Sequence, residues 1–168
     1  MTRRRIDDTM TQLPSLGPRG EGWVVLQFAL LGLVALAGLM AGGAWTGTPA
    51  LVTAVVGLAL MVGGAALLGR GLIDLGRHLT PVPYPRDDAE LVEAGVYAYL
   101  RHPMYSALIV TAVGWGLVVA SPLALLLTGL LAVFFDLKAR REEAWLAQRY
   151  AGYADYMTRT WRLVPRLY

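Results

Sequence analysis

Residues 95–105 read Gly-Val-Tyr-Ala-Tyr-Leu-Arg-His-Pro-Met-Tyr, and a long apolar run follows them directly. Pro103 is typical of the first turn of a helix, where its missing N–H group costs nothing. The sequence therefore predicts that Arg101 and His102 lie at the mouth of a membrane helix, where free backbone N–H groups and the helix dipole favour an anion. A guanidinium, an imidazole and a helix N-terminus at the lipid–water boundary suit a carboxylate or a phosphate.

The composition indicates a membrane protein. Of the 168 residues, 56% are hydrophobic and 16% are charged, whereas soluble domains carry roughly 25% charged residues. The length suits one bundle of a few helices. The absence of cysteine excludes disulfides, thiolate catalysis and thiolate metal sites. With only two histidines in the chain, we expect no metal site. We also expect no nucleic-acid partner.

Two uncharged runs in the first half predict two membrane-spanning helices. The run from Trp23 to Ala44 has 22 residues, enough to cross about 30 Å of hydrocarbon. A cleaved signal peptide is the alternative, although a cleaved apolar core is usually only about 7–15 residues long. The second run, from Leu51 to Leu68, continues to about Gly76 through an i,i+4 pair of Arg70 and Asp74.

A third apolar stretch predicts a tight helical hairpin. Between His102 and Phe135 the sequence has no Asp, Glu, Lys or Arg, and one helix of this length would be about 50 Å long, more than a bilayer requires. Ser121-Pro122 supplies a break. We therefore expect one arm from Pro103 to Ala120 and a returning arm from Pro122 to Leu137. An amphipathic helix is then expected from Asp136 to about Trp161, with i,i+4 pairs Asp136/Arg140 and Lys138/Glu142.

The basic residues predict the topology. All 15 Lys and Arg fall into three groups: four in the first 22 residues, four between Arg70 and Arg101, and seven from Lys138 onward. Four spans with both termini and the central loop in the cytosol keep every basic residue inside. We therefore expect a multi-pass protein with cytosolic N- and C-termini, in the inner membrane if the source is bacterial. The proline-rich loop at 79–85 should not be helical, and Asp87–Glu93 should form a short helical turn on the membrane surface.

This topology brings two charged walls to the same side of the membrane. The hairpin returns Glu142 and Glu143 to the level of Arg101 and His102. A zwitterionic ligand that carries a carboxylate and an ammonium or sulfonium group would suit such a pair of walls. Adjacent residues lie about 100° apart around a helix, so only one of the two glutamates should point at a ligand.

Three motifs together resemble those of the isoprenylcysteine carboxyl methyltransferase family, which belongs to a wider group of membrane methyltransferases that includes the phospholipid N-methyltransferases. They are LVxxGxYxxxRHPxY at 91–105, then EExxL at 142–146 after the apolar hairpin, and YxxY at 153–156. The resemblance covers about residues 79–165. Together with the apolar runs, it leads us to expect three parts: a cytosolic N-terminal tail at 1–22, the first two transmembrane helices at 23–76, and a methyltransferase-like catalytic half at 77–168.

The resemblance implies that S-adenosylmethionine binds along the 91–105 strip. It implies that Arg101 and Glu143 are catalytic and that Lys138 faces the acceptor. Lys138 stands where the prenylcysteine enzymes usually have Arg, and Lys loses the bidentate fork that matches a free carboxylate. The residues implied to bind the cofactor are Leu91, Val92, Tyr97, His102, Pro103, Met104, Tyr105 and Glu142.

The expected protein is thus an all-α integral membrane bundle of four transmembrane helices, the last two a tight hairpin. It has a cytosolic cofactor-binding loop and a C-terminal amphipathic helix, and it acts on a lipophilic or amphiphilic acceptor that enters sideways from the bilayer. Methyl transfer from a sulfonium is a direct displacement; an amine or hydroxyl acceptor would need a base, for which Glu143 and His102 are the candidates.

Two alternatives belong to other classes. An NADPH-dependent sterol- or isoprenoid-type reductase also resembles the C-terminal half, although Met104 and Arg141-Glu142-Glu143 depart from its motifs. The other alternative is a non-catalytic lipid-binding bundle. Taken singly, Arg101 is equally typical of an anchor for lipid headgroups.

Overall fold

A computed structural model of the chain describes residues 13–80, 82, 84 and 90–166. Within these ranges all regular secondary structure is helical, apart from one isolated bridge between Leu100 and Trp161, so the all-α prediction is confirmed. The elements are the helices α2 (Glu21–Met40), α3 (Gly47–Leu75), α4 (Pro103–Val118), α5 (Pro122–Arg149) and α6 (Tyr153–Arg159), with the 3-10 turns η1 (Gly76–His78) and η2 (Gly95–Ala98). The predicted tail up to residue 12 and residues 87–89 of the predicted Asp87–Glu93 helical turn lie outside the described residues, and the prediction is wrong for 90–93, which are not helical.

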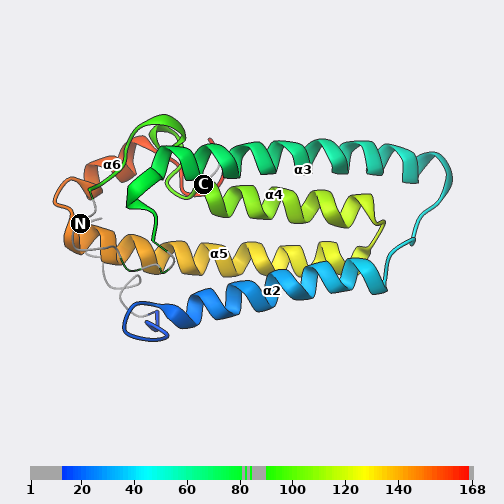
Figure 1. Cartoon of the computed structure of the whole chain (residues 1–168), viewed down its shortest axis with the longest axis horizontal. Coiled ribbons are helices and arrows are strands. Elements are labelled where there is room, and N and C mark those ends of the chain that lie inside the picture. The colour runs from blue at the N-terminus through cyan, green and yellow to red at the C-terminus, as the bar shows by residue number, and fades with distance from the viewer. Residues whose placement is uncertain (1–12, 81, 83, 85–89, 167–168) are drawn as a thin grey trace.

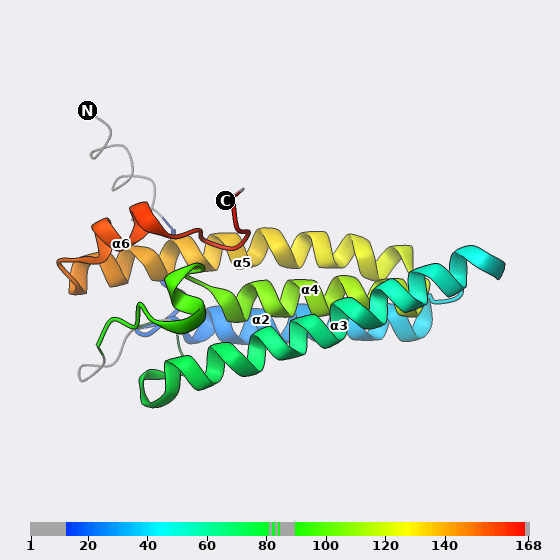
Figure 2. The same ribbon diagram turned by 90° about the horizontal axis from the view of Figure 1, so that it is seen from above.

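Four of the helices lie side by side in an elongated bundle (Figures 1 and 2). Helices α4 and α5 occupy the middle, α3 packs along α4, and α2 packs along α5. Small residues allow α3 and α4 to approach closely: a Cβ added to Gly57 would lie 2.6 Å from the carbonyl oxygen of Gly114. Helix α6 and the loop that contains η2 gather at the end of the bundle where α4 begins (Figure 1).

A short turn joins α4 to α5 and is tied to α2. Ser121 caps α5, because its hydroxyl oxygen accepts a hydrogen bond from the backbone N–H of Ala124 at 3.2 Å. The same hydroxyl donates to the carbonyl oxygen of Ala37 in α2 at 3.2 Å. Pro122 occupies the first turn of α5, where it needs no hydrogen-bond partner. This end of the bundle is therefore closed by three helices together.

Within the described part of the chain, three segments are long and apolar enough to cross a membrane: Glu21–Met40, Gly47–His78 and Pro122–Arg149. Helix α4 is apolar but has only 16 residues, about 24 Å at the rise of an α-helix. The surfaces of α2 and α3 are largely exposed apolar side chains, among them Phe28, Leu39 and Val55. Such surfaces are expected where lipid replaces water as the solvent.

The structure corrects several predicted helix boundaries. Helix α5 does not end near Leu137 but continues to Arg149, and the chain then turns before α6, so no single amphipathic helix extends to Trp161. Charged residues begin at Asp136 without ending the helix, because i,i+4 pairs such as Asp136–Arg140, 2.8 Å apart, continue it. Helix α2 ends at Met40, before the predicted Ala44.

Candidate functional site

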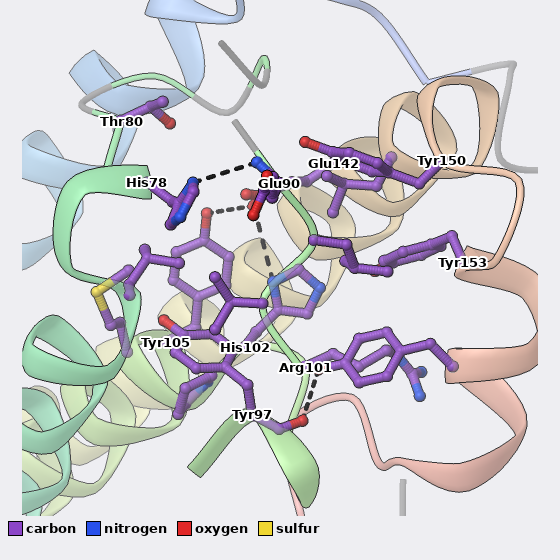
Figure 3. A pocket seen from close by; sticks show the side chains of 17 residues that line it. His78, Thr80, Glu90, Tyr97, Arg101, His102, Tyr105, Glu142, Tyr150 and Tyr153 are labelled. Carbon is purple, nitrogen blue, oxygen red and sulfur yellow. Dashed lines mark hydrogen bonds and ion pairs between the residues drawn. The ribbon is translucent and has the colours of Figure 1, made fainter. Parts of the chain in front are cut away.

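A pocket opens at the end of the bundle where α4 begins (Figure 3). All eight residues that the sequence analysis assigned to a cofactor line it, and Arg101 joins them. Lys138 and Glu143 do not belong to its lining. Sequence reasoning did not assign the other lining residues to the cofactor, and these are Leu75, His78, Thr80, Glu90, Leu146, Tyr150, Tyr153 and Tyr156.

A tight turn after the loop places Tyr97 in the wall of the pocket. Gly95 has φ +62°, a conformation that glycine adopts without a steric cost. The carboxylate of Asp74 lies against this glycine and accepts a hydrogen bond from the backbone N–H of Val96 at 2.8 Å. Asp74 also pairs with Arg70 at 2.9 Å, as the sequence predicted. The end of α3 therefore fixes the turn from which the buried side chain of Tyr97 extends.

The first turn of α4 presents an imidazole, a phenol and a carboxylate in direct contact. The rings of His102 and Tyr105 are stacked, with centroids 5.2 Å apart and an interplanar angle of 3°. The hydroxyl of Tyr105 donates to Oε2 of Glu142 at 2.7 Å, and Nδ1 of His102 lies 3.7 Å from the same oxygen (Figure 3). The hairpin thus brings Glu142 to the helix mouth, where it gives an aromatic pocket one negative wall.

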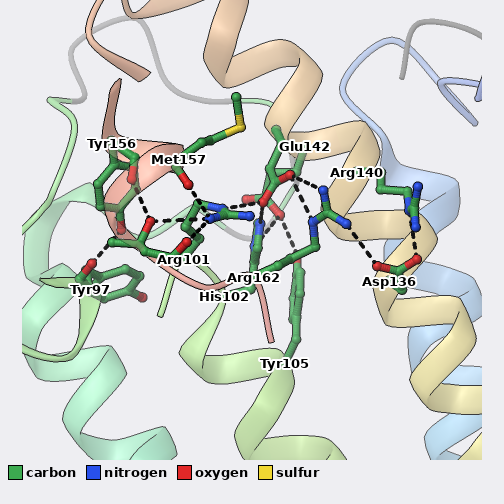
Figure 4. A network of polar contacts seen from close by, with 12 residues as sticks. Tyr97, Arg101, His102, Tyr105, Asp136, Arg140, Glu142, Tyr156, Met157 and Arg162 are labelled. Atoms are coloured by element: carbon green, nitrogen blue, oxygen red, sulfur yellow. Dashed lines mark hydrogen bonds and ion pairs between the residues drawn. The ribbon is translucent and has the colours of Figure 1, made fainter. Parts of the chain in front are cut away.

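The adjacent glutamate serves a buried ion network behind the pocket (Figure 4). Glu143 has no exposed side-chain surface and accepts hydrogen bonds from Nε of Arg101 at 2.7 Å and from Nε of Arg162 at 2.9 Å. Nε2 of His102 lies 3.3 Å from Glu143 Oε1, and Arg162 also reaches Asp136 at 3.3 Å. Both carboxylate oxygens are therefore occupied, and Glu143 fixes the positions of Arg101 and His102.

The C-terminal segment completes the network by pairing with the residues before α4. The backbone N–H of Arg101 donates to the carbonyl oxygen of Trp161 at 2.8 Å, and that of His102 donates to Arg162 at 3.2 Å. The guanidinium of Arg101 also donates to the carbonyl oxygens of Met157 and Thr160. No sequence pattern predicts this role for Arg162, because nothing distinguishes it from the other basic residues near the C-terminus.

Buried tyrosines line the side of the pocket that faces α6. The hydroxyl of Tyr156 donates to the carbonyl oxygen of Tyr97 at 2.6 Å. Burial raises the pKa of Tyr97, Tyr153 and Tyr156 above the ordinary value for a phenol. These side chains therefore stay neutral at physiological pH. The YxxY motif was the sequence signal that marked the two tyrosines of α6.

Lys138 lies outside the pocket lining, between α5 and α2. Its side chain is 4% exposed, and its ammonium donates to the amide oxygen of Gln27 in α2. The same ammonium lies 5.0 Å from the ring centroid of Tyr105. The predicted pair of Lys138 with Glu142 is not among the ion pairs of the described residues, because the lysine turns toward α2 instead.

The part of the chain that the structure describes contains no cluster of metal ligands. No group of three or more His, Cys, Asp or Glu side chains there is arranged to hold an ion. The pocket instead offers aromatic faces, apolar side chains, the guanidinium of Arg101, two imidazoles and two carboxylates. Such a set suits an organic cation with an apolar or aromatic portion.

Comparison with known proteins gives the same class of protein. A family model described as phospholipid methyltransferase matches residues 52–152. Protein-S-isoprenylcysteine O-methyltransferase of Dictyostelium discoideum is 29% identical over 117 residues, which are 67% of this chain and 49% of that protein. A probable protein-S-isoprenylcysteine O-methyltransferase of Oryza sativa subsp. indica is 31% identical over 105 residues, 60% of this chain and 55% of that protein.

A further relative carries a different name. The nickel-cobalt-cadmium resistance protein NccN of Alcaligenes xylosoxydans xylosoxydans is 35% identical over 83 residues, 49% of this chain and 39% of that protein. The chain spans about half the length of the two isoprenylcysteine methyltransferases that it matches. The match to the family model includes most of α3, all of α4 and α5, and η2, and it leaves out α2.

Proposed function

Because this chain belongs to the phospholipid methyltransferase family, we propose that it is an integral-membrane enzyme that uses S-adenosylmethionine to methylate a lipophilic or amphiphilic acceptor. One observation carries the proposal: the chain brings Glu142 within 3.7 Å of His102 at the mouth of α4, inside a single pocket. The two residues are 40 positions apart in the sequence and belong to the separate motifs that carry the resemblance.

The pocket offers a partner for each part of the proposed cofactor. We assign the adenosine to Leu91, Val92 and Tyr97, whose apolar and aromatic surfaces suit a purine. We assign the sulfonium and the ammonium to the region of Glu142 and the tyrosine rings, where a carboxylate and aromatic faces stabilise cations. The carboxylate of the cofactor would lie near the N-terminus of α4.

S-adenosylmethionine supplies a methyl group on a sulfonium, which leaves as a neutral thioether when the acceptor attacks. The residues of this chain hold the methyl donor and the acceptor in position and exclude water from the site. We propose that Arg101 acts directly, from the wall of the pocket. Glu143 acts indirectly, because its carboxylate holds the guanidinium of Arg101 in position through a hydrogen bond of 2.7 Å. An acceptor that must lose a proton needs a general base. We assign this role to His102, which lines the pocket.

The proposal also includes the arrangement in the membrane. We propose that α2, α3, α4 and α5 all cross the bilayer and that the pocket faces the cytosol. The three groups of basic residues support this orientation, since it leaves none of them on the far side. Helix α4 is short for a span, and tilting of its neighbours or local thinning of the bilayer would accommodate it.

Two measurements on the purified protein test the function. Calorimetry should detect binding of S-adenosylmethionine and S-adenosylhomocysteine, and a tritiated-methyl assay should label a component of a membrane lipid extract. A matched control is Asp155→Asn, which removes a charge from the exposed face of α6 and should leave both results unchanged. Failure to bind either compound would refute the proposal, and binding of NADPH in their place would favour the reductase.

A further inference from the structure

Two side chains, from the end of α3 and from the turn η1 after it, hold a strip of chain at 90–96. At the start of the strip, the backbone N–H of Glu90 donates to Nδ1 of His78 at 3.1 Å (Figure 3). Near its end, the backbone N–H of Val96 donates to the carboxylate of Asp74 at 2.8 Å. The strip is therefore fastened at both ends by side chains that accept hydrogen bonds from its backbone.

The strip carries one wall of the pocket and has little structure of its own. Residues 90–93 form no regular secondary structure, so their position depends on contacts with the rest of the chain. Leu91 and Val92, to which we assign the adenosine of the cofactor, line the pocket directly after the first fastening. A further contact joins the side chains of Glu93 and Arg159 at 2.9 Å, but they are 36% and 56% exposed, and such ion pairs contribute little.

His78 lies in the pocket lining, although the sequence motifs give it no role. Gly76 ends α3 with φ +49°, a conformation that favours glycine, and η1 then carries His78 toward the pocket. A backbone N–H group can only donate, so Nδ1 of His78 must be the ring nitrogen with the lone pair. Nε of Arg77 lies 3.4 Å from Nε2, which is long for a hydrogen bond. The contact with Glu90 is therefore the hydrogen bond that defines the position of the ring.

We propose that His78 is a positioning residue of the cofactor site: by accepting the backbone hydrogen bond of Glu90, it holds Leu91 and Val92 where they receive the adenosine. The inference rests on the proposed function, since it concerns the same pocket. It gives the turn after α3 a part in binding the methyl donor. We assign the sulfonium to the region of Glu142, so His78 should control the affinity for the cofactor rather than the rate of methyl transfer.

Two ligands that share the adenosyl group test which part of the cofactor His78 serves. Calorimetry on the purified protein compares S-adenosylmethionine with 5′-methylthioadenosine, a thioether that lacks the amino acid and the sulfonium. His78→Leu removes the acceptor but keeps an apolar side chain, and it should weaken binding of both ligands about fivefold, the effect of one lost hydrogen bond. Glu142→Gln should weaken only S-adenosylmethionine, because 5′-methylthioadenosine carries no cation.

Further replacements at position 78 separate the hydrogen bond from the volume of the side chain. In His78→Asn the amide oxygen lies at the same bond separation from the backbone as Nδ1, so this variant should bind both ligands nearly as the wild type does. His78→Gln moves the oxygen one bond further and should resemble His78→Leu. Glu93→Gln is the matched control in the strip: it removes an exposed ion pair and should leave both affinities unchanged.

Two more measurements distinguish positioning from catalysis and from folding. In the tritiated-methyl assay with a membrane lipid extract, His78→Leu should raise the apparent KM for S-adenosylmethionine about fivefold and leave the maximal rate unchanged. Thermal unfolding followed by tryptophan fluorescence should give His78→Leu a midpoint close to that of the wild type, because His78 is only half-buried and Glu90 is exposed.

Three results would overturn the inference. They are unchanged affinity for both ligands in His78→Leu, a loss confined to S-adenosylmethionine, and a loss in His78→Asn as large as that in His78→Leu. The last result would show that the ring acts through its packing. Each can occur while the wild type still binds S-adenosylmethionine, which would leave the proposed function intact. A wild type that binds neither ligand would instead refute the proposed function, and the inference with it.

Discussion

Replacing Glu143 with glutamine should lower the unfolding temperature of the protein by about 6–12 °C. The carboxylate has no exposed surface and lies between the guanidinium groups of Arg101 and Arg162, so the amide leaves two buried cations without their shared anion. Removing one partner of a buried ion pair costs about 3–5 kcal/mol. The lower value applies here, because Arg101 keeps two carbonyl oxygens and Arg162 keeps Asp136. A loss of about 3 kcal/mol lowers the midpoint by about 2–4 °C per kcal/mol at this chain length.

The assay follows intrinsic tryptophan fluorescence during heating of the protein in detergent. The chain has five tryptophans and no cysteine, so thiol-reactive dyes would give no signal. Asp155→Asn is the control, because it removes a carboxylate from an ion pair in which both side chains are more than half exposed. Such a pair should contribute little to stability. Equal midpoints for the Glu143 variant and the control would refute the assignment of a buried network.

Three further predictions concern the pocket. Glu142→Gln should weaken binding of S-adenosylmethionine about tenfold, since it removes the negative charge from the wall; calorimetry that finds equal affinity would contradict this. Gly95→Ala should lower the free energy of unfolding by about 1–2 kcal/mol, because φ is +62° and the new Cβ would meet the carboxylate of Asp74. An unchanged midpoint in the fluorescence assay would contradict this prediction, since it would show that the turn relaxes freely. Burial raises the pKa of Tyr97 and Tyr156, so these phenols stabilise the fold fully below about pH 10 and lose that contribution as the pH rises further. The midpoint of Tyr156→Phe should therefore fall less steeply above pH 10 than that of the wild type, and parallel curves would argue against the raised pKa.

The apolar runs predicted which parts of the chain are helical, because length and absence of charge are properties of the sequence alone. Their ends were less predictable. The charges from Asp136 onward predict the start of a second helix, yet α5 continues through them, since side-chain pairs at i,i+4 stabilise a helix in water as well as at a membrane surface. The helix ends at Arg149, where the backbone of Tyr150 becomes extended with φ −110° and ψ 113°.

The motifs predicted which residues line the pocket but not the role of each residue. Helical geometry indicated that only one of Glu142 and Glu143 would face a ligand, and only Glu142 lines the pocket. The hydrogen-bond partners of Glu143 could not be predicted from helical geometry. Arg162 reaches it because the C-terminal segment pairs with the residues before α4, a contact between distant parts of the chain that no local pattern encodes.

Ultraviolet cross-linking of radiolabelled S-adenosylmethionine to the purified protein, followed by peptide mapping, tests the central claim most directly. The label should be saturable, should be displaced by S-adenosylhomocysteine, and should lie in peptides that cover residues 91–105 or 142–156. Absence of displaceable label, or label confined to α2 and the first half of α3, would contradict the claim that the mouth of α4 and the facing turn of α5 hold the methyl donor.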